Sequence, residues 1–180
     1  MDHQNSIPEE EPVLFQARVF KIVERTQVGR SGKLLKRQVV KHPGAVGIVP
    51  ILPDGRVLLI NQYRVTFQRE IYEIPAGTRE IGEETIVTAS RELIEETGYR
   101  AGKLELLNSI YTSPGVLQEE LFIYLATDLV EGESAPEDGE KIVPEPKTWA
   151  EIDKMIVSGE IHDAKTIAGL FLAKRKLGIN

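Results

Sequence analysis

The sequence predicts an α/β/α sandwich, a central β-sheet between helices, preceded by a small antiparallel β element. Two neighbouring apolar segments, 46–52 and 56–62, predict buried central strands because neither shows the alternation of a half-buried strand. Helical patterns follow at 83–97 and towards the C-terminus. Buried strands flanked by helices favour a layered α/β arrangement.

The N-terminal region is predicted to form two strands joined by a turn. The residue composition of segments 17–24 and 34–41 favours strands, and the cluster QVGRSGK at 27–33 between them favours a turn. Residues 1–12 are polar and acidic and lack the apolar stretch of a secretory signal, which predicts a mobile tail. The expected organisation is a tail at 1–12, a β element at 13–44 and the main domain at 45–180.

The clearest helix, 83–97, ends before Gly98, a residue suited to the left-handed position after a helix. A turn at 53–55 separates the two central strands. Beyond the helix, the patterns predict strands at 104–111 and 121–126, a long acidic loop at 131–145, and helices at 149–157 and 164–177.

Composition narrows the range of functions. The 180 residues are 41% hydrophobic and 28% charged, which is ordinary for one soluble domain. No run approaches the ~18 apolar residues of a membrane span. The net charge is −6 without a dense basic block, which argues against nucleic-acid binding. Because cysteine is absent, there is no disulfide or thiolate site, and the cytoplasm is the default compartment.

Three glutamates in the predicted helix 83–97 suggest a site for hard cations. On a helix, Glu92 and Glu96 share one face and Glu95 lies one position round the edge. Such carboxylates repel one another unless cations lie among them, and all-oxygen ligands favour Mg²⁺ or Mn²⁺ over zinc. The competing interpretation is a solvated Glu-rich helix in which Arg91 simply pairs with Glu95.

The full pattern around these glutamates is highly specific. Segment 77–99, GTREIGEETIVTASRELIEETGY, fits Gly-x5-Glu-x7-Arg-Glu-U-x-Glu-Glu-x-Gly-U, with U apolar, at every fixed position. Chance would give such a match roughly once in a billion starts. The segment resembles the Nudix box, and the resemblance implies the Nudix fold with a mixed central sheet.

The resemblance assigns roles to the box residues. It implies that Glu92 and Glu96 ligate Mg²⁺, or Mn²⁺, together with the backbone carbonyl of Ala76, and that Glu95 and Glu96 take part in catalysis. Glu95 would ligate metal or orient water. The remaining three positions would be structural: Glu83 and Arg91 as braces of the loop and carboxylates, and Gly77 as the point where backbone approaches the metal.

Upstream and downstream segments resemble the branch of the family that acts on ADP-ribose and nucleotide sugars. QYR at 62–64 and EIPAG at 73–77 are typical of it, so Arg64 would contact phosphate; a surface cation is the alternative. Pro114, sixteen residues beyond Gly98, matches the spacing in ADP-ribose hydrolases, although Ser-Pro-Gly is also an ordinary turn.

The acidic loop would supply a further carboxylate. Members of this branch draw a general base or an extra ligand from the matching segment, here 136–142. Glu140 is the candidate from its place before Ile142, and Glu137 and Asp138 are the alternatives.

Asp-Ala-Lys at 163–165 bears on the substrate. Asp163 fits an ordinary helix N-cap, but Lys165 in the first turn opposes the helix dipole. An Asp-x-Lys here resembles the nucleoside diphosphate sugar hydrolases, so Asp163 and Lys165 join the expected substrate-binding residues. We therefore expect hydrolysis of nucleoside diphosphate sugars, with a strict ADP-ribose pyrophosphatase as the alternative.

The expected partners are a small nucleotide-sugar substrate and a second copy of the chain, with neither nucleic acid nor a membrane. In this branch the N-terminal β element is exchanged between subunits, and 17–40 has a suitable composition, so a homodimer is expected. Two other functions compete. A non-catalytic binding module is disfavoured because Glu92, Glu95 and Glu96 are intact, and hydrolysis of dinucleoside polyphosphates or nucleoside triphosphates is disfavoured by Pro114 and Lys165.

Overall fold

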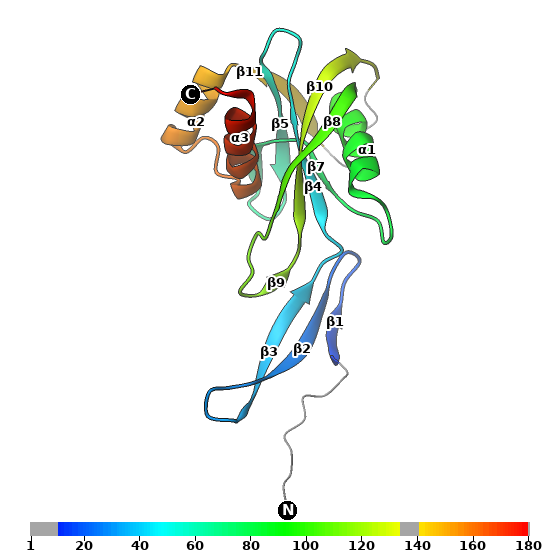
Figure 1. Cartoon of the computed structure of the whole chain (residues 1–180), viewed down its shortest axis with the longest axis vertical. Helices are drawn as coiled ribbons and strands as arrows, with labels where there is room; N and C mark the ends of the chain where they lie inside the picture. Colours follow the sequence, from blue (N-terminus) through cyan, green and yellow to red (C-terminus); the bar gives the residue numbers. More distant parts are fainter. Residues whose placement is uncertain (1–10, 134–140, 180) are drawn as a thin grey trace, which may run out of the picture. The chain divides into compact units, whose positions relative to one another are not determined.

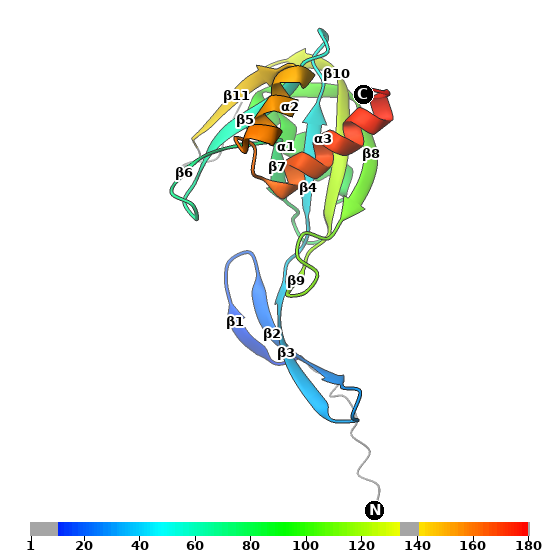
Figure 2. The same cartoon turned by 90° about the vertical axis from the view of Figure 1, so that its left-hand side faces the viewer.

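The structure, a computed structural model, describes residues 11–133 and 141–179 (Figures 1 and 2). The chain divides into two compact units. The described residues up to Pro43, with Tyr111–Glu119, form the first, and Gly44–Ile110 with the chain from Glu120 onward form the second. No helix in the described residues is long and apolar enough to cross a membrane.

The first unit is a four-stranded sheet in the order β1-β2-β3-β9. Its strands are β1 (Val13–Gln16), β2 (Lys21–Val28), β3 (Leu34–Lys41) and β9 (Leu117–Gln118). Strands β1 to β3 are antiparallel, and β9 runs parallel to β3. The strand predicted at 34–41 is confirmed. The one predicted at 17–24 begins later, at Lys21, because Ala17 donates its N–H to the carbonyl of Phe20 at 2.9 Å and closes a turn there.

The second unit contains two sheets, in the orders β7-β4-β10-β8 and β11-β5-β6. Their strands are β4 (Ala45–Pro50), β5 (Val57–Arg64), β6 (Arg69–Glu73), β7 (Ala76–Thr78), β8 (Tyr99–Ile110), β10 (Leu121–Glu131) and β11 (Ile142–Lys147). Strand β10 is parallel to β4 and antiparallel to β8, which makes the first of these sheets mixed.

Helices cover both faces of these sheets, as Figures 1 and 2 show. They are α1 (Thr85–Thr97), α2 (Trp149–Ser158) and α3 (Ala164–Leu177). Strand β4 is apolar on both faces: Val46 and Ile48 belong to the core with Leu93 of α1, and Val49 to the core with Leu170 of α3. Alternate residues of one strand thus bury against opposite helical layers, which confirms the α/β/α sandwich.

Several predicted boundaries differ from the structure: β8 begins at Tyr99, earlier than the strand expected from Leu104, and β10 extends beyond Ala126. Helix α1 begins at Thr85, two residues later than expected, with Glu84 in extended conformation as its N-cap. The acidic loop expected at 131–145 is too long, because β10 continues through Glu131 and β11 begins at Ile142. Strand β11 contains Pro144 and Pro146. These prolines fit because β11 is the edge strand of its sheet and needs hydrogen bonds on one side only.

Candidate active site

Helix α1 presents two carboxylates to the backbone of β7. Glu92 lies so close to Gly77 that a Cβ built there would be 1.9 Å from the Glu92 carboxyl carbon. Glu96, only 5% exposed, accepts the N–H of Ala76 through Oε2 at 2.8 Å. The sequence-predicted Ala76, Gly77, Glu92 and Glu96 are therefore together. Glu92 and Glu96, four residues apart on the helix, thus lie against Gly77 and Ala76, which are consecutive in the strand.

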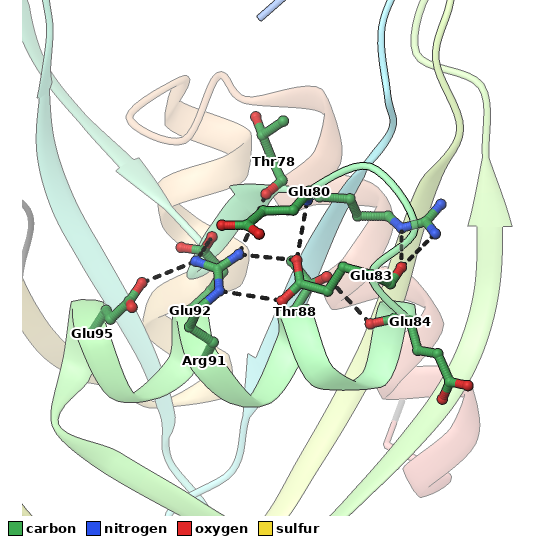
Figure 3. A network of polar contacts seen from close by, with 9 residues as sticks. Thr78, Glu80, Glu83, Glu84, Thr88, Arg91, Glu92 and Glu95 are labelled. Carbon is green, nitrogen blue, oxygen red and sulfur yellow. Dashed lines mark hydrogen bonds and ion pairs between the residues drawn. The ribbon is translucent and has the colours of Figure 1, made fainter.

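Arg91 lies among three of the box glutamates, as Figure 3 shows. It donates through Nη1 to Glu92 at 2.7 Å and to Glu95 at 3.1 Å, and through Nη2 to Glu83 at 3.3 Å. Partial burial alone would lower the pKa of Arg91, but the carboxylates of Glu83 and Glu92 raise it. Arg91 is therefore a permanent cation that holds these three side chains in place. We call Glu83, Arg91, Glu92, Glu95 and Glu96 the box cluster.

Glu83 also fixes the loop that leads into α1. Its carboxylate accepts the backbone N–H of Glu80 at 3.1 Å, and its backbone carbonyl accepts Nη2 of Arg79 at 2.6 Å. The ion pair with Arg91 keeps the pKa of Glu83 below its usual value. Glu83 thus links the loop to the helix, which is the arrangement expected of a bracing residue. No sequence pattern singles out Arg79, whose contact with the carbonyl of Glu83 appears only in the structure.

A second group of charges lies at the end of β6. Glu73 is 3% exposed, and its two carboxylate oxygens accept Nε and Nη2 of Arg64, each at 2.7 Å. Lys165 of α3 donates to Oε2 of the same carboxylate, and also to Asp163 at 2.9 Å. Burial would raise the pKa of Glu73, but Arg64 and Lys165 hold it below its usual value. We call Arg64, Glu73, Asp163 and Lys165 the Glu73 cluster.

The N-terminus of α3 gives Asp163 two tasks. It is the N-cap, accepting the N–H of Thr166 at 2.9 Å, and it also holds Lys165. The Thr166 hydroxyl in turn accepts the N–H of Ile74 at 2.8 Å, which ties the start of α3 to the segment between β6 and β7. The capping interpretation of Asp163 and its association with Lys165 are therefore compatible.

The two clusters are close enough to influence each other. Glu73 makes the largest contribution to the raised pKa of Arg64, and Glu96 and Asp163 add to it through their charges. Arg64 is therefore the cation of the Glu73 cluster that acts on the box cluster. The sequence pattern places Glu73 only within the EIPAG segment and predicts no role for it. The one local signal is its position between Tyr72 and Ile74, where a charged residue interrupts an apolar stretch.

Two expected site residues lie outside these two clusters in the described structure. Pro114 belongs to the first unit, in the turn where Val116 donates its N–H to the carbonyl of Ser113 at 3.1 Å. Glu140, with the alternatives Glu137 and Asp138, lies outside the described residues. The remaining predicted residues all belong to one of the two clusters or to their backbone contacts.

The donor set of the box cluster suits a hard cation. The carboxylates of Glu92 and Glu96 lie against consecutive residues of β7. These two side chains offer only oxygen atoms as ligands, which hard cations prefer. Within the described residues, no three acidic or histidine side chains converge closely enough to hold a metal without help. Backbone oxygen and water would complete the coordination, as is usual for Mg²⁺.

Comparison with known proteins identifies relatives of the chain. Residues 41–170 match the NUDIX domain family. An ADP-ribose pyrophosphatase from Bacillus subtilis (strain 168) is 41% identical over 138 residues, which are 76% of this chain and 75% of that protein. A methanol dehydrogenase activator from Bacillus methanolicus is 37% identical over 156 residues, covering 86% of this chain and 84% of that protein.

A solved structure confirms the fold. The crystal structure of an ADP compounds hydrolase superposes with a TM-score of 0.82 and covers 96% of this chain and 94% of that one. The two sequences are 24% identical, so the similarity establishes the architecture alone.

Proposed function

Because the chain belongs to the Nudix family and is a Nudix hydrolase, we propose that it hydrolyses the diphosphate bond of nucleoside diphosphate sugars. The products are a nucleoside monophosphate and a sugar phosphate. The observation that carries this proposal is the pair of clusters at β7 and β6. Glu92 and Glu96 provide oxygen ligands for a cation, and Arg64 of the adjoining Glu73 cluster provides a guanidinium suited to phosphate.

Charge balance supports the need for divalent ions. Six carboxylates in the two clusters (Glu73, Glu83, Glu92, Glu95, Glu96 and Asp163) face three cations (Arg64, Arg91 and Lys165). A diphosphate would be repelled from this surface unless further positive charge entered with it. We propose that Glu92, Glu96 and the carbonyl of Ala76 hold Mg²⁺, with Mn²⁺ as a substitute. When bound, Mg²⁺ neutralises phosphate oxygens and lowers the pKa of a ligated water.

The chain's own groups then position the substrate and move the proton. Arg64 binds a phosphate oxygen, with Pro114, Asp163 and Lys165 also assigned to substrate binding. The general base is a carboxylate that takes a proton from the attacking water, and we assign this step to Glu140.

Other residues keep the water and the carboxylates in place. Glu95, held by Arg91 at 3.1 Å, orients the water from the edge of the helix. Gly77, Glu83 and Arg91 maintain the geometry of the box cluster without touching the reacting atoms. Phosphoryl chemistry needs this kind of positioning more than covalent help.

A strict ADP-ribose pyrophosphatase, which gives AMP and ribose 5-phosphate, is the second candidate. It is favoured by the 41% identity to the Bacillus subtilis enzyme. The broader activity is favoured by Lys165, whose ammonium forms ion pairs with Glu73 and Asp163. A lysine there would be an unusual choice for a helix start if it had no function, since the dipole disfavours it.

We also propose that the active form is a homodimer in which the first unit contacts the second copy. Strand β1 is at the edge of its sheet, and three consecutive residues on it, Val13, Leu14 and Phe15, are each more than half exposed. An exposed apolar edge strand favours pairing with another chain. Light scattering should give the mass of a dimer, and Phe15→Lys should lower it; a wild-type monomer would contradict the proposal.

The decisive experiment is hydrolysis of a substrate panel with Mg²⁺ and then with EDTA. The panel contains ADP-ribose, ADP-glucose, GDP-mannose, a diadenosine polyphosphate and a nucleoside triphosphate, with products identified. We expect Mg²⁺-dependent release of a nucleoside monophosphate and a sugar phosphate from several nucleotide sugars. Turnover of ADP-ribose alone would establish the second candidate. No turnover of any compound would indicate a non-catalytic binding module of the same fold.

A further inference from the structure

Glu73 connects the two cations that the proposed function assigns to substrate binding. We propose that Glu73 is a positioning residue that couples Arg64 and Lys165, so that Lys165 influences substrate binding through the orientation of Arg64. The inference rests on the proposed function. It adds a role for Glu73, which in this scheme does not contact the reacting phosphate.

The contact with Arg64 fixes the plane of its guanidinium. Both carboxylate oxygens of Glu73 are used, Oε1 by Nε and Oε2 by Nη2, each at 2.7 Å. The Glu73 side chain is 4% exposed, so water is largely excluded as a replacement partner. A fork of two parallel hydrogen bonds sets direction as well as distance. Nη1 of Arg64 is not engaged by Glu73 and is the nitrogen left for phosphate.

Lys165 binds the same carboxylate, through an oxygen that Arg64 also uses. Its ammonium is shared by Oε2 of Glu73 and by Asp163, and its side chain is 16% exposed. Asp163 is itself fixed by the hydroxyl of Thr166, which donates to it at 2.6 Å. The positive charge of Lys165 is therefore paired with the carboxylates of Glu73 and Asp163. In our proposal, Lys165 acts through Glu73.

The sharing of one oxygen couples the two cations. Oε2 of Glu73 accepts from both Nη2 of Arg64 and the ammonium of Lys165. Without Lys165, Oε2 of Glu73 keeps a single donor, and the carboxylate is no longer held from the side of α3. The guanidinium bonded to it would then lose the fixed direction of Nη1. Loss of Glu73 has the same result, because Arg64 and Lys165 lose their common anchor and repel each other.

A double-mutant cycle tests the coupling. Glu73→Gln and Lys165→Met should each raise KM for nucleotide sugars by about tenfold or more, with kcat changed by less than about threefold. If Lys165 acts only through Glu73, removing it from the Glu73→Gln variant should raise KM no further, so the double variant should match Glu73→Gln. Additive losses would overturn the proposal, because they would mean that Lys165 acts on the substrate independently.

Asp153 and Lys174 provide a matched control. Their carboxylate–lysine pair, at 2.6 Å, also includes a lysine of α3, and the Asp153 side chain is 52% exposed. Asp153→Asn, Lys174→Met and their combination should leave KM within about twofold of wild type, since ion pairs with an exposed partner contribute little. An equal rise in KM for this pair would overturn the specific role of Glu73.

A spectroscopic measurement makes the inference independent of turnover. In ¹⁵N-labelled protein, the Nε–H signal of Arg64, assigned with Arg64→Lys, should shift and exchange at a different rate with water in Lys165→Met. The Nε–H of Arg91, which is hydrogen-bonded to Glu83 at 3.4 Å, should not change. An unchanged Arg64 signal would overturn the coupling even if Glu73→Gln fails to fold. Wild-type protein without turnover would refute the proposed function, whereas this signal would still decide the coupling.

Discussion

Replacing Gly77 with alanine should displace the carboxylate of Glu92. A Cβ at this position would be 1.9 Å from the Glu92 carboxyl carbon and 2.0 and 2.3 Å from its two oxygens. Because ordinary contact begins at 3.4 Å, the carboxylate must retreat by about 1.5 Å. Glu92 can do so by rotating its side chain, since the clash involves the flexible end of the residue. The backbone of β7 need not move, so the fold should survive.

The loss of activity follows from the size of this displacement. A catalytic group misplaced by ~1 Å can cost about a hundredfold in rate. We therefore expect kcat/KM of Gly77→Ala to fall by at least about a hundredfold, equivalent to about 2.7 kcal/mol of barrier. Steady-state kinetics on the best nucleotide sugar, repeated over a range of Mg²⁺ concentrations, would measure it. Part of the activity should return at high Mg²⁺ if Glu92 is a ligand.

Gly55 offers a control in which the substitution should lower stability and leave activity unchanged. It lies in the turn between β4 and β5, has φ of +85°, and has nothing within 4 Å of an added Cβ. Gly55→Ala should cost about 1–2 kcal/mol of folding free energy through backbone strain and leave kcat/KM unchanged. Gly77→Ala with wild-type activity would refute the argument that Glu92 must lie against β7. If both variants lost the same stability, the lower activity of Gly77→Ala would be explained by a folding defect.

Three further predictions concern carboxylates. Glu96→Gln should lower turnover by about 100- to 1,000-fold without lowering the Tm, because the amide oxygen can still accept the N–H of Ala76; near-normal activity would reject Glu96 as a ligand. Glu140→Gln should slow the reaction at least about a hundredfold, and a smaller effect would move the role to Glu137 or Asp138. Glu73, whose pKa is lowered from 4.5, should stabilise the fold above that pH and lose this contribution as pH falls through its folded pKa. Between about pH 6 and pH 3, the Tm of Glu73→Gln should therefore fall less than that of wild type, and equal slopes would contradict the assignment.

Both ends of α3 and the C-terminal end of α1 were predictable because local signals fix them. Helix α3 begins and ends where the sequence places it, with Asp163 accepting the N–H of Thr166 at its start. Helix α1 ends at Thr97 because Gly98 has φ of 77° and donates its N–H to the carbonyl of Ile94. Each signal acts within four residues of the chain. The box cluster was predictable for the same reason, since most of its contacts are made within one helix and the loop before it.

The Glu73 cluster was not predictable in this way. Glu73 and Lys165 are separated by 92 residues, and no short pattern states that they meet. The short strands β7 and β9 and the edge strand β11 are also set by distant partners, since each exists only as an addition to a longer strand. Pro144 and Pro146 argued against a strand in any interior position. Only the sheet order, with β11 at an edge, makes them acceptable.

One short segment, 73–77, organises both clusters. Glu73 binds Arg64 and Lys165, and two residues of β7 lie against the glutamates of α1: the N–H of Ala76 is donated to Glu96, and Gly77 leaves space for Glu92. The residues between them are fixed to the core. Ile74 is fully buried and donates its N–H to Thr166, and the carbonyl of Pro75 accepts the N–H of Ile48 at 2.8 Å.

This arrangement explains why buried charges are tolerated at the site. Glu73 and Glu96 are each at most 5% exposed, and burying a carboxylate is costly unless its partners are already in place. The segment 73–77 supplies or orients those partners before any ligand arrives, and its own backbone is held by β4 and α3. The proposed metal ligands and the proposed phosphate-binding arginine therefore share contacts with one backbone segment. A substitution that moves the segment should change both metal dependence and KM, whereas one within a single cluster should change one of them.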